Sequence, residues 1–291
     1  MHVRFPRFVI FCLSLFSLLS LLSTATLAQT AASCTFTLFD FGGDTGAQPS
    51  GVNRWGNVVG NSTAGPFIRF SDGRIQKLPF IGFVGKRNAS GITVGSFSTS
   101  DNHTHGFIQN GTQRTVVDFP GATHTVLRGI NRFGTVVGSA SASGAFSVAL
   151  KIQNGKLIEL PFGTNTSVSP QAISDTGVIV GNYLLPDPNT PGVVESHGFV
   201  LGNNLFTDFM FPGATSGTAN DINASGMIVG DFGSPNGPGH YIYSSGKFFT
   251  VKLPGASGVL SGINGFGEIT GFIFQNTAPF SRGFVGRCTL P

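Results

Sequence analysis

The sequence predicts an all-β fold built from repeats, and three observations support this prediction. The pattern Asn-x-x-Gly-x-(Ile/Val)-Val-Gly returns six times with small changes. Glycine and phenylalanine are frequent, with 42 and 29 of the 291 residues, while charged residues make up only 10%. After the N-terminal segment, apolar residues do not follow the helical period. Short strands, tight turns and aromatic packing suit such a composition.

The first 28 residues are expected to be a secretory signal peptide. Basic Arg4 and Arg7 precede the apolar run 8–22, and small residues follow up to a plausible cleavage site after Ala28. The alternative is an uncleaved membrane anchor, because the apolar run is long. Residues 29–291 are then a single repeat domain without a second membrane span.

Each motif is interpreted as a strand, a tight turn and a second strand. The leading Asn can accept hydrogen bonds from the backbone of its own turn, and the Gly three residues later can adopt positive φ. The closing glycines are Gly60, Gly95, Gly138, Gly181, Gly230 and Gly271. Their spacing brackets the period of about 40–45 residues that is typical of four-stranded propeller blades.

Two further strands are expected in each repeat. The third begins at 65–67, 105–107, 144–146, 197–199, 239–241 and 282–284, in sequences such as His-Gly-Phe. A glycine-containing hairpin turn follows, and the fourth strand ends in Pro-Gly, as at 120–121, 212–213 and 254–255.

The two ends of the chain carry incomplete repeats. The sequence Phe36–Gly43 resembles a fourth strand without a third, and Arg282–Cys288 resembles a third strand without a fourth. Together they complete one blade. We therefore predict a six-bladed β-propeller closed by the N-terminal strand joining the last blade. An open β-solenoid and a different number of blades are the alternatives.

The two cysteines of the mature chain fall at this join. Aligned with a complete repeat, Cys34 and Cys288 take the places of Thr112 and Gly111, which are neighbours in a turn. We expect a disulfide, which an exported protein can keep, and which would contribute roughly 4–5 kcal/mol in the chain-entropy model. A lipidated Cys34 is the alternative, since Ala31–Cys34 loosely resembles a lipobox.

With these motifs the chain resembles the HAF-type extracellular repeat family of bacteria over about residues 35–290. The six motifs, His-Gly-Phe at 105–107 and 197–199, and Asp-Phe-Pro-Gly-Ala at 118–122 carry the resemblance. The His-Ala-Phe element that names the family occurs only in altered forms such as Gly144-Ala145-Phe146. The resemblance implies export and a repeat β fold, and it implies no catalytic residues.

Charge and composition limit the possible partners. The formal charge of +4 falls to +2 once Arg4 and Arg7 are removed, and no Lys/Arg cluster is present, which argues against nucleic acid. We expect a monomer without cofactor. His103 and His105 share a strand face but lack a third ligand, so no metal site is predicted.

The acidic residues do not suggest a catalytic pair. Asp40, Asp118 and Glu159 share a repeat position that is Lys77 or Lys252 in other repeats, which is typical of a solvated strand site. The acids Asp175, Asp221 and Glu268 lie in or beside turns, where they either shape the turn or line one end of a central channel. Asp231 is the only acid directly after a closing glycine. His105 and His197 are repeat-equivalent, which favours a structural or interblade hydrogen bond.

The sequence therefore predicts a secreted or cell-surface binding module for a carbohydrate, cell-wall component or extracellular protein. The candidate binding residues are Trp55, Phe133 and Phe266 at hairpin tips, and Asp187 and Glu195 in the irregular insertion 184–196. The alternative for the aromatics is packing between blades. The alternative functions are a propeller-type hydrolase or lyase acting on polysaccharide, and a purely structural or adhesive repeat protein.

Overall fold

The chain folds entirely into β-structure. The computed structural model describes residues 30–43, 46–143, 145–162, 166–186, 193–278 and 280–291, and these residues form strands and no helix. The predicted signal peptide, residues 1–28, lies outside the described residues. Within them, no helix long and apolar enough to cross a membrane occurs.

The strands are short and follow one another at regular intervals. The first half contains β1 (Ser33–Phe39), β2 (Gln48–Val52), β3 (Val58–Ser62), β4 (Gly65–Arg69), β5 (Ile75–Lys77), β6 (Phe83–Arg87), β7 (Thr93–Ser98), β8 (Thr104–Asn110), β9 (Gln113–Val117), β10 (His124–Ile130), β11 (Val136–Ser141), β12 (Val148–Gln153) and β13 (Lys156–Glu159). The second half contains β14 (Val168–Ile173), β15 (Ile179–Pro186), β16 (Val194–Gly202), β17 (Leu205–Asp208), β18 (Ser216–Ile222), β19 (Ile228–Ser234), β20 (Gly237–Ser244), β21 (Lys247–Val251), β22 (Gly258–Ile263), β23 (Glu268–Phe274) and β24 (Ser281–Thr289).

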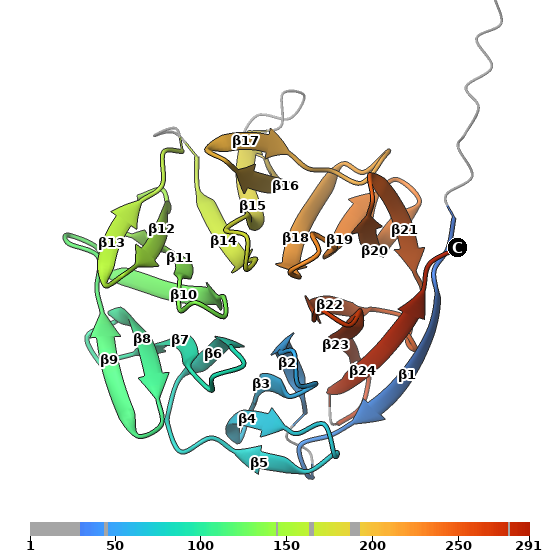
Figure 1. The fold of residues 1–291 in the computed structure, drawn as a ribbon, viewed down its shortest axis with the longest axis horizontal. Helices are drawn as coiled ribbons and strands as arrows, with labels where there is room; N and C mark the ends of the chain where they lie inside the picture. Colours follow the sequence, from blue (N-terminus) through green and yellow to red (C-terminus); the bar gives the residue numbers. More distant parts are fainter. Residues whose placement is uncertain (1–29, 44–45, 144, 163–165, 187–192, 279) are drawn as a thin grey trace, which may run out of the picture.

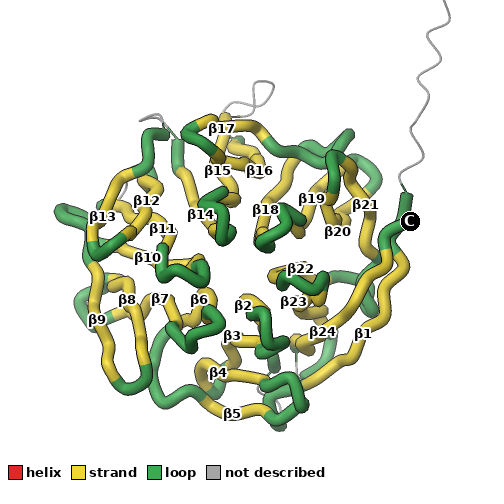
Figure 2. The backbone as a smooth tube through the Cα atoms, viewed as in Figure 1, coloured by secondary structure: helices red, strands yellow, loops and turns green. Residues whose placement is uncertain are grey.

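These strands form a propeller arrangement around a central axis. The first strands of the repeats, such as β2, β10 and β18, lie nearest the axis, and the fourth strands, such as β5 and β13, lie at the rim (Figure 1). Loops connect the strands at both ends of the sheets (Figure 2). The prediction of an all-β fold with four-stranded sheets is confirmed.

The sheets differ in one respect from the expected six separate blades. Four sheets have four strands each, and a fifth has eight strands, β6–β13. The physical reason is a single parallel bridge between Thr104 of β8 and His124 of β10, which joins two four-stranded halves. Each four-stranded sheet and each half of the eight-stranded sheet is one repeat unit.

The N-terminal strand β1 pairs with the C-terminal strand β24. The antiparallel register sets Cys34 directly opposite Cys288, and the two form a disulfide across a sequence separation of 254 residues. The predicted disulfide is thereby confirmed, and lipidation of Cys34 is excluded because its thiol is already bonded.

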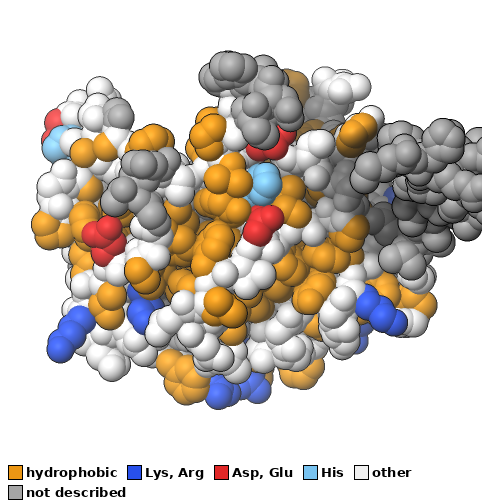
Figure 3. All heavy atoms as spheres, turned by 90° about the horizontal axis from the view of Figure 1, so that it is seen from above, with side chains coloured by type: hydrophobic (Ala, Val, Ile, Leu, Met, Phe, Trp, Pro, Cys, Tyr) orange, Lys and Arg blue, Asp and Glu red, His pale blue; other side chains and the backbone are white. Residues whose placement is uncertain are grey.

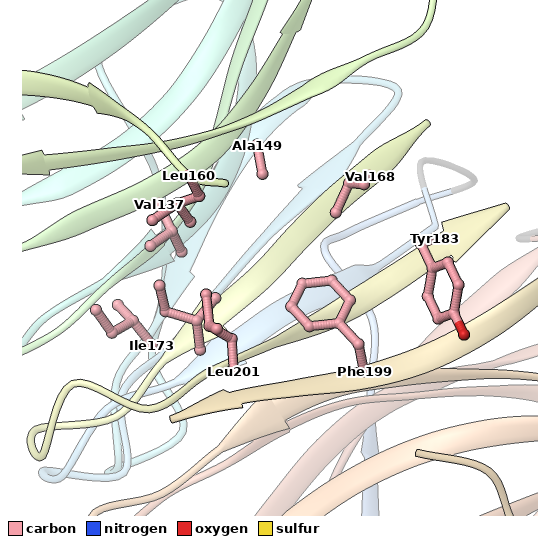
Figure 4. Close-up of a cluster of buried hydrophobic side chains, with 9 residues drawn as sticks. Val137, Ala149, Leu160, Val168, Ile173, Tyr183, Phe199 and Leu201 are labelled. Carbon is pink, nitrogen blue, oxygen red and sulfur yellow. The ribbon is translucent and has the colours of Figure 1, made fainter. Parts of the chain in front are cut away.

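The hydrophobic core lies between neighbouring repeat units. One cluster joins Val137 and Ala149 of β11 and β12 to Val168, Ile179 and Phe199 of the following sheet (Figure 4). A second cluster joins Phe39, which ends β1, to Ala47, Val58 and Phe67 of the first unit. Each sheet therefore buries its apolar faces only by packing against its neighbours.

The closing glycines make room for this packing. A Cβ on Gly271 would lie 2.0 Å from the carbonyl oxygen of Val259 and 2.6 Å from Cζ of Phe284. Gly271 and Phe284 are directly opposite in the β23–β24 register. The third repeat differs, because Gly138 opposes Leu150. The predicted strand start at 144–146 is therefore wrong, and Phe146 is exposed rather than core.

Candidate functional site

The leading Asn of each motif organises one end of the molecule. As expected for a turn, Asn53 Oδ1 accepts hydrogen bonds from the N–H groups of Trp55 and Asn57, at 3.0 and 3.1 Å. The turn glycines have positive φ, for example +75° at Gly56. Both sequence predictions about this turn are confirmed.

The same Asn side chains also connect the repeats to one another. Asn53 Nδ2 donates to the carbonyl of Asn88 at 3.4 Å, and Asn264 Nδ2 donates to the carbonyl of Asn53 at 3.1 Å. Equivalent bonds run from Asn88 to Asn131, from Asn131 to Ser174 and from Asn223 to Asn264. At Ser174 the shorter hydroxyl instead contacts Thr176. These amides form a ring that is interrupted only at Ser174 among the motif-leading residues.

This ring borders a turn-side cavity of about 310 Å³. The turns between first and second strands form this end of the molecule, the turn face, and antiparallel pairing brings the turns between third and fourth strands to the same face. Arg54, Arg132, Asp175 and Phe266 also line the cavity.

The three predicted aromatic residues are exposed on the turn face. Trp55, Phe133 and Phe266 expose 57%, 67% and 66% of their surface, so the rings are not buried between blades, although the indole N–H of Trp55 donates to the carbonyl of Ala89 in the next repeat at 3.3 Å. The guanidinium carbons of Arg54 and Arg132 lie 4.7 and 4.5 Å from the ring centres of Trp55 and Phe133. Two of the three rings are thus paired with an arginine in cation–π geometry.

Charge is segregated between the two ends of the molecule. Basic residues at or beside turn-face turns are Arg54, Arg69, Arg74, Arg87, Arg114, Arg132, Lys156, Lys247 and Arg287, against the acids Asp72, Asp175 and Glu268. The opposite face carries more acids than bases: the acids Asp40, Asp101, Asp118, Glu159, Glu195 and Asp208, against the basic residues Lys77, Lys252 and Arg282. The side view shows the same separation, with Lys and Arg toward the lower edge and acidic and His side chains above (Figure 3).

The histidines of the opposite face pair with acids. His105 Nδ1 lies 2.9 Å from Asp118, and His197 Nδ1 lies 3.2 Å from Asp208. Arg282 pairs with Asp40 in the same way, at 2.9 Å. Each of these bonds lies within one sheet, so of the two expected roles for His105 and His197 the structural hydrogen bond is confirmed, while these two pairs form no interblade bond. At the predicted solvated strand site the Asp118 side chain is half-exposed, and in addition Asp40 pairs with Arg282 and Asp118 with His105.

The predicted insertion lies away from the aromatic tips. Residues 184–186 and 194–196 extend the β15–β16 hairpin on the opposite face, with Leu185 opposite Glu195. Glu195 Oε2 lies 3.8 Å from His197 Nε2. Asp187 lies outside the described residues. The structure therefore does not bring Glu195 together with Trp55, Phe133 and Phe266.

An ion pair crosses the central channel below the turn-side cavity. Lys86 Nζ lies 2.9 Å from Asp221 Oδ2 and donates to the carbonyl of Ser261 at 2.9 Å. Backbone N–H groups of Ile222 and Ile263 also donate to Asp221. Asp221 is buried and the side chain of Lys86 is only 12% exposed, and a Cβ on Gly51 would lie 2.4 Å from Lys86 Cδ. Sequence reasoning predicted neither this ion pair nor the role of Gly51.

A second cavity, of about 270 Å³, lies on the other side of this pair. The first two strands of every repeat carry a β-bulge three residues before the motif-leading position, as between Leu127 and Gly129. The residues at this bulge position all line the cavity: Ser50, Gly85, Arg128, Gln171, Asn220 and Ser261. Apart from the two serines, each repeat has a different residue at this position. This variation within an otherwise regular repeat is the sequence signal that could have indicated a cavity here.

The acids considered for catalysis have separate partners. Asp175 pairs with Arg132, Asp221 with Lys86, Asp231 with His240, and Glu268 with Arg287. Among the described residues no group of three or more His, Cys, Asp or Glu could hold a metal ion. Because each of these four acids has its own partner, no two of them form an acid–base pair.

No family model and no curated protein matches the sequence. The structure is similar to TolB from Acinetobacter baumannii, with 14% identity and a TM-score of 0.49 over 84% of this chain and 66% of the other. This chain thus spans just under two thirds of the TolB chain. It is also similar to an Aleuria aurantia lectin mutant in complex with α-methyl-L-fucoside, with 10% identity, a TM-score of 0.49 and coverage of 89% and 95%.

A third similar structure is a calcium-binding protein, regucalcin, from Agrobacterium tumefaciens. The identity is 12% and the TM-score 0.47, over 82% of this chain and 89% of the other. With identities this low, the function of this chain has to be argued from its own residues.

Proposed function

We propose that this chain is an exported binding module that recognises an acidic glycan through its turn face. The observation that carries the proposal is the exposure of Trp55, Phe133 and Phe266 on turns that surround the turn-side cavity. Exposed aromatic rings gathered on one face of a folded protein are typical of an interaction site.

The chemistry of this face favours a sugar polymer with negative charges. Flat aromatic rings stack on the apolar faces of pyranose rings. Arg54 and Arg132 stand beside two of the rings, and a guanidinium can hold a carboxylate through two parallel hydrogen bonds. Arg132 already pairs with Asp175, so Arg54 is the better placed of the two. The excess of basic side chains on this face attracts an acidic ligand before contact is made.

Calorimetric titration of residues 29–291 with an oligogalacturonate tests the proposal. Replacing the three rings together, by Trp55→Ala, Phe133→Ala and Phe266→Ala, should weaken binding by at least about tenfold, since about 1.4 kcal/mol corresponds to that factor. Binding should also weaken as salt is raised, because exposed charges are screened.

The matched control is Phe280→Ala, which removes an equally exposed ring, 67% accessible, beside β24 on the opposite face. This variant should bind as the unaltered protein does. Equal binding by the triple variant would overturn the aromatic site. Equal binding of a neutral galacto-oligosaccharide would overturn the acidic class of ligand.

Export and family membership belong to the same proposal. The N-terminal segment has the features of a signal peptide, and the Cys34–Cys288 disulfide suits an extracellular or periplasmic compartment. We assign the chain to the HAF-type repeats on its six motifs.

We also infer a closed six-bladed ring. The eight-stranded sheet then counts as two blades, because one bridge alone joins β8 and β10. The pairing of β1 with β24 and the hydrogen bond from Asn264 to Asn53 support closure. In an open solenoid the first and last repeats lie far apart, so neither of these contacts could form.

A further inference from the structure

Arg128 stands out among the residues that line the second cavity. It occupies the bulge position of β10, and a bulge changes the direction of a side chain relative to the regular strand. Its Nε is buried without a hydrogen-bond partner, and no carboxylate of the described chain forms an ion pair with it. Burial lowers the pKa of its guanidinium.

Two other arginines have a buried unpaired nitrogen, but their setting differs. The guanidinium of Arg69 lies 5.0 Å from the ring centre of Phe39, and that of Arg114 lies 4.5 Å from the ring centre of Phe107. No aromatic ring of the described chain stacks on Arg128 in this way. Arg128 is only partly buried, but its Nε is buried without a partner and the residue lines a cavity, so an anion from outside the chain could supply the missing acceptor.

The electrostatics of the cavity select an anion. Its lining contains two cations, Lys86 and Arg128, and no acidic residue. Lys86 is neutralised by Asp221 at 2.9 Å, whereas Arg128 has no such partner. The cavity therefore carries one uncompensated positive charge, which matches a single carboxylate.

The rest of the lining selects a polyhydroxylated ligand of small size. Amide and hydroxyl groups come from Gln48, Ser50, Gln171, Asn220 and Ser261. The donors of the last four already bond within the protein, so their oxygens are left to accept from hydroxyl groups of a ligand. The rings of Phe83 and Phe272 add apolar surface, and Phe83 is 43% exposed. The cavity volume of about 270 Å³ lies just below the range of about 300–1,000 Å³ that is typical of ligand cavities, so only a small ligand fits.

We propose that the cavity formed by the bulge residues binds a sugar acid, with the carboxylate held by the guanidinium of Arg128. Guanidinium and carboxylate are complementary in shape and charge, and hydroxyl groups of the sugar donate hydrogen bonds to the amide oxygens of Gln171 and Asn220. This site lies across the Lys86–Asp221 pair from the turn-side cavity, so it is independent of the function proposed for the turn face.

Calorimetric titration of residues 29–291 with galacturonate, galactose, acetate and inorganic phosphate tests this site. Galacturonate should bind, and galactose should bind about 10–100-fold more weakly, since a hydrogen bond to a charged group contributes about 1.5–3 kcal/mol. Arg128→Gln should lose galacturonate affinity by the same factor. Lys252→Gln, which removes an exposed positive charge elsewhere, should leave it unchanged.

Thermal unfolding without ligand provides a second measurement. Arg128→Met should unfold at a higher temperature than the unaltered protein, because a partly buried charge with an unpaired Nε is removed. A lower unfolding temperature would assign Arg128 a structural role and overturn the proposal.

Three titration results would also overturn it: no galacturonate binding, unchanged binding by Arg128→Gln, or equal binding of acetate or phosphate. The triple aromatic variant separates the two proposals. It should bind monomeric galacturonate normally even where it no longer binds the oligomer.

Discussion

At the scale of single residues, the repeats differ most where their side chains meet at the axis. Two residues before the motif-leading position, four repeats have Gly or Ala, while the other two have Lys86 and Asp221. Small residues let the backbones approach one another, as at Gly262 beside Gly51. The one charged pair divides the channel into two cavities.

Removing one partner of this pair should be costly. Lys86→Met leaves the Asp221 carboxylate buried without its cation, and we expect a loss of about 3–5 kcal/mol in the free energy of unfolding at neutral pH. Denaturant titration measures this loss. The double variant Lys86→Met with Asp221→Asn should recover most of it.

The loss should also depend on pH. Burial raises the pKa of Asp221, and the Lys86 ammonium opposes that rise. Without Lys86 the pKa rises further, so the folded protein favours the neutral carboxyl. A raised pKa of an acid stabilises the fold at low pH and this stabilisation is lost as pH rises. The deficit should therefore shrink as pH falls toward 4, and a deficit independent of pH would contradict this account.

At the scale of elements, each motif serves both its own turn and the next repeat. The Oδ1 of the leading Asn accepts from its own turn, and its Nδ2 donates to the carbonyl of the following repeat, as Asn131 does to Ser174 at 3.1 Å. Serine can accept the turn hydrogen bond, as Ser174 does from Val178, but its single hydroxyl cannot reach the next carbonyl.

Restoring the missing amide should stabilise the protein. In Ser174→Asn the new Nδ2 can donate to the carbonyl of Asn223, and we expect a gain of about 0.5–1.5 kcal/mol in the free energy of unfolding. The reverse substitution, Asn131→Ser, should lose a similar amount or more. Denaturant titration of both variants checks the pair, and a loss of stability in Ser174→Asn would contradict the interrupted ring of amides.

At the scale of the whole molecule, the two ends of the chain are held in one sheet. Cys34 and Cys288 link residues 254 positions apart, so the disulfide constrains nearly all of the described chain when it unfolds. The apolar cluster around Phe39, Ala47 and Phe67 then joins this sheet to the first repeat.

Loss of the disulfide should lower stability more than any single core contact. We expect Cys34→Ser with Cys288→Ser to lose about 4–5 kcal/mol in the free energy of unfolding. Reduction of the unaltered protein should produce the same loss, while reductant should not affect the double variant. A double variant as stable as the oxidised protein would show that the link does not constrain the unfolded chain.

Much of the fold follows from local patterns. The Asn and Gly of each motif predict the turn, since turn geometry depends on neighbouring residues alone. The cysteine pairing also follows, because aligned repeats place the two residues at one turn. The prediction of the third strand failed in the third repeat. Gly144-Ala145-Phe146 resembles a strand start, whereas the register places Leu150 opposite Gly138.

The sequence by itself determined most strands, their turns, the disulfide and the position of Trp55, Phe133 and Phe266 at hairpin tips, because these depend on neighbouring residues or on the alignment of repeats. Whether these three rings are exposed was left open by the sequence and decided by the structure. The tertiary structure decided that Lys86 meets Asp221 and that Arg128 enters a cavity without a partner. The physical reason is that a β-bulge changes the direction of a side chain, and residues from distant repeats become neighbours only when the sheets surround a common axis.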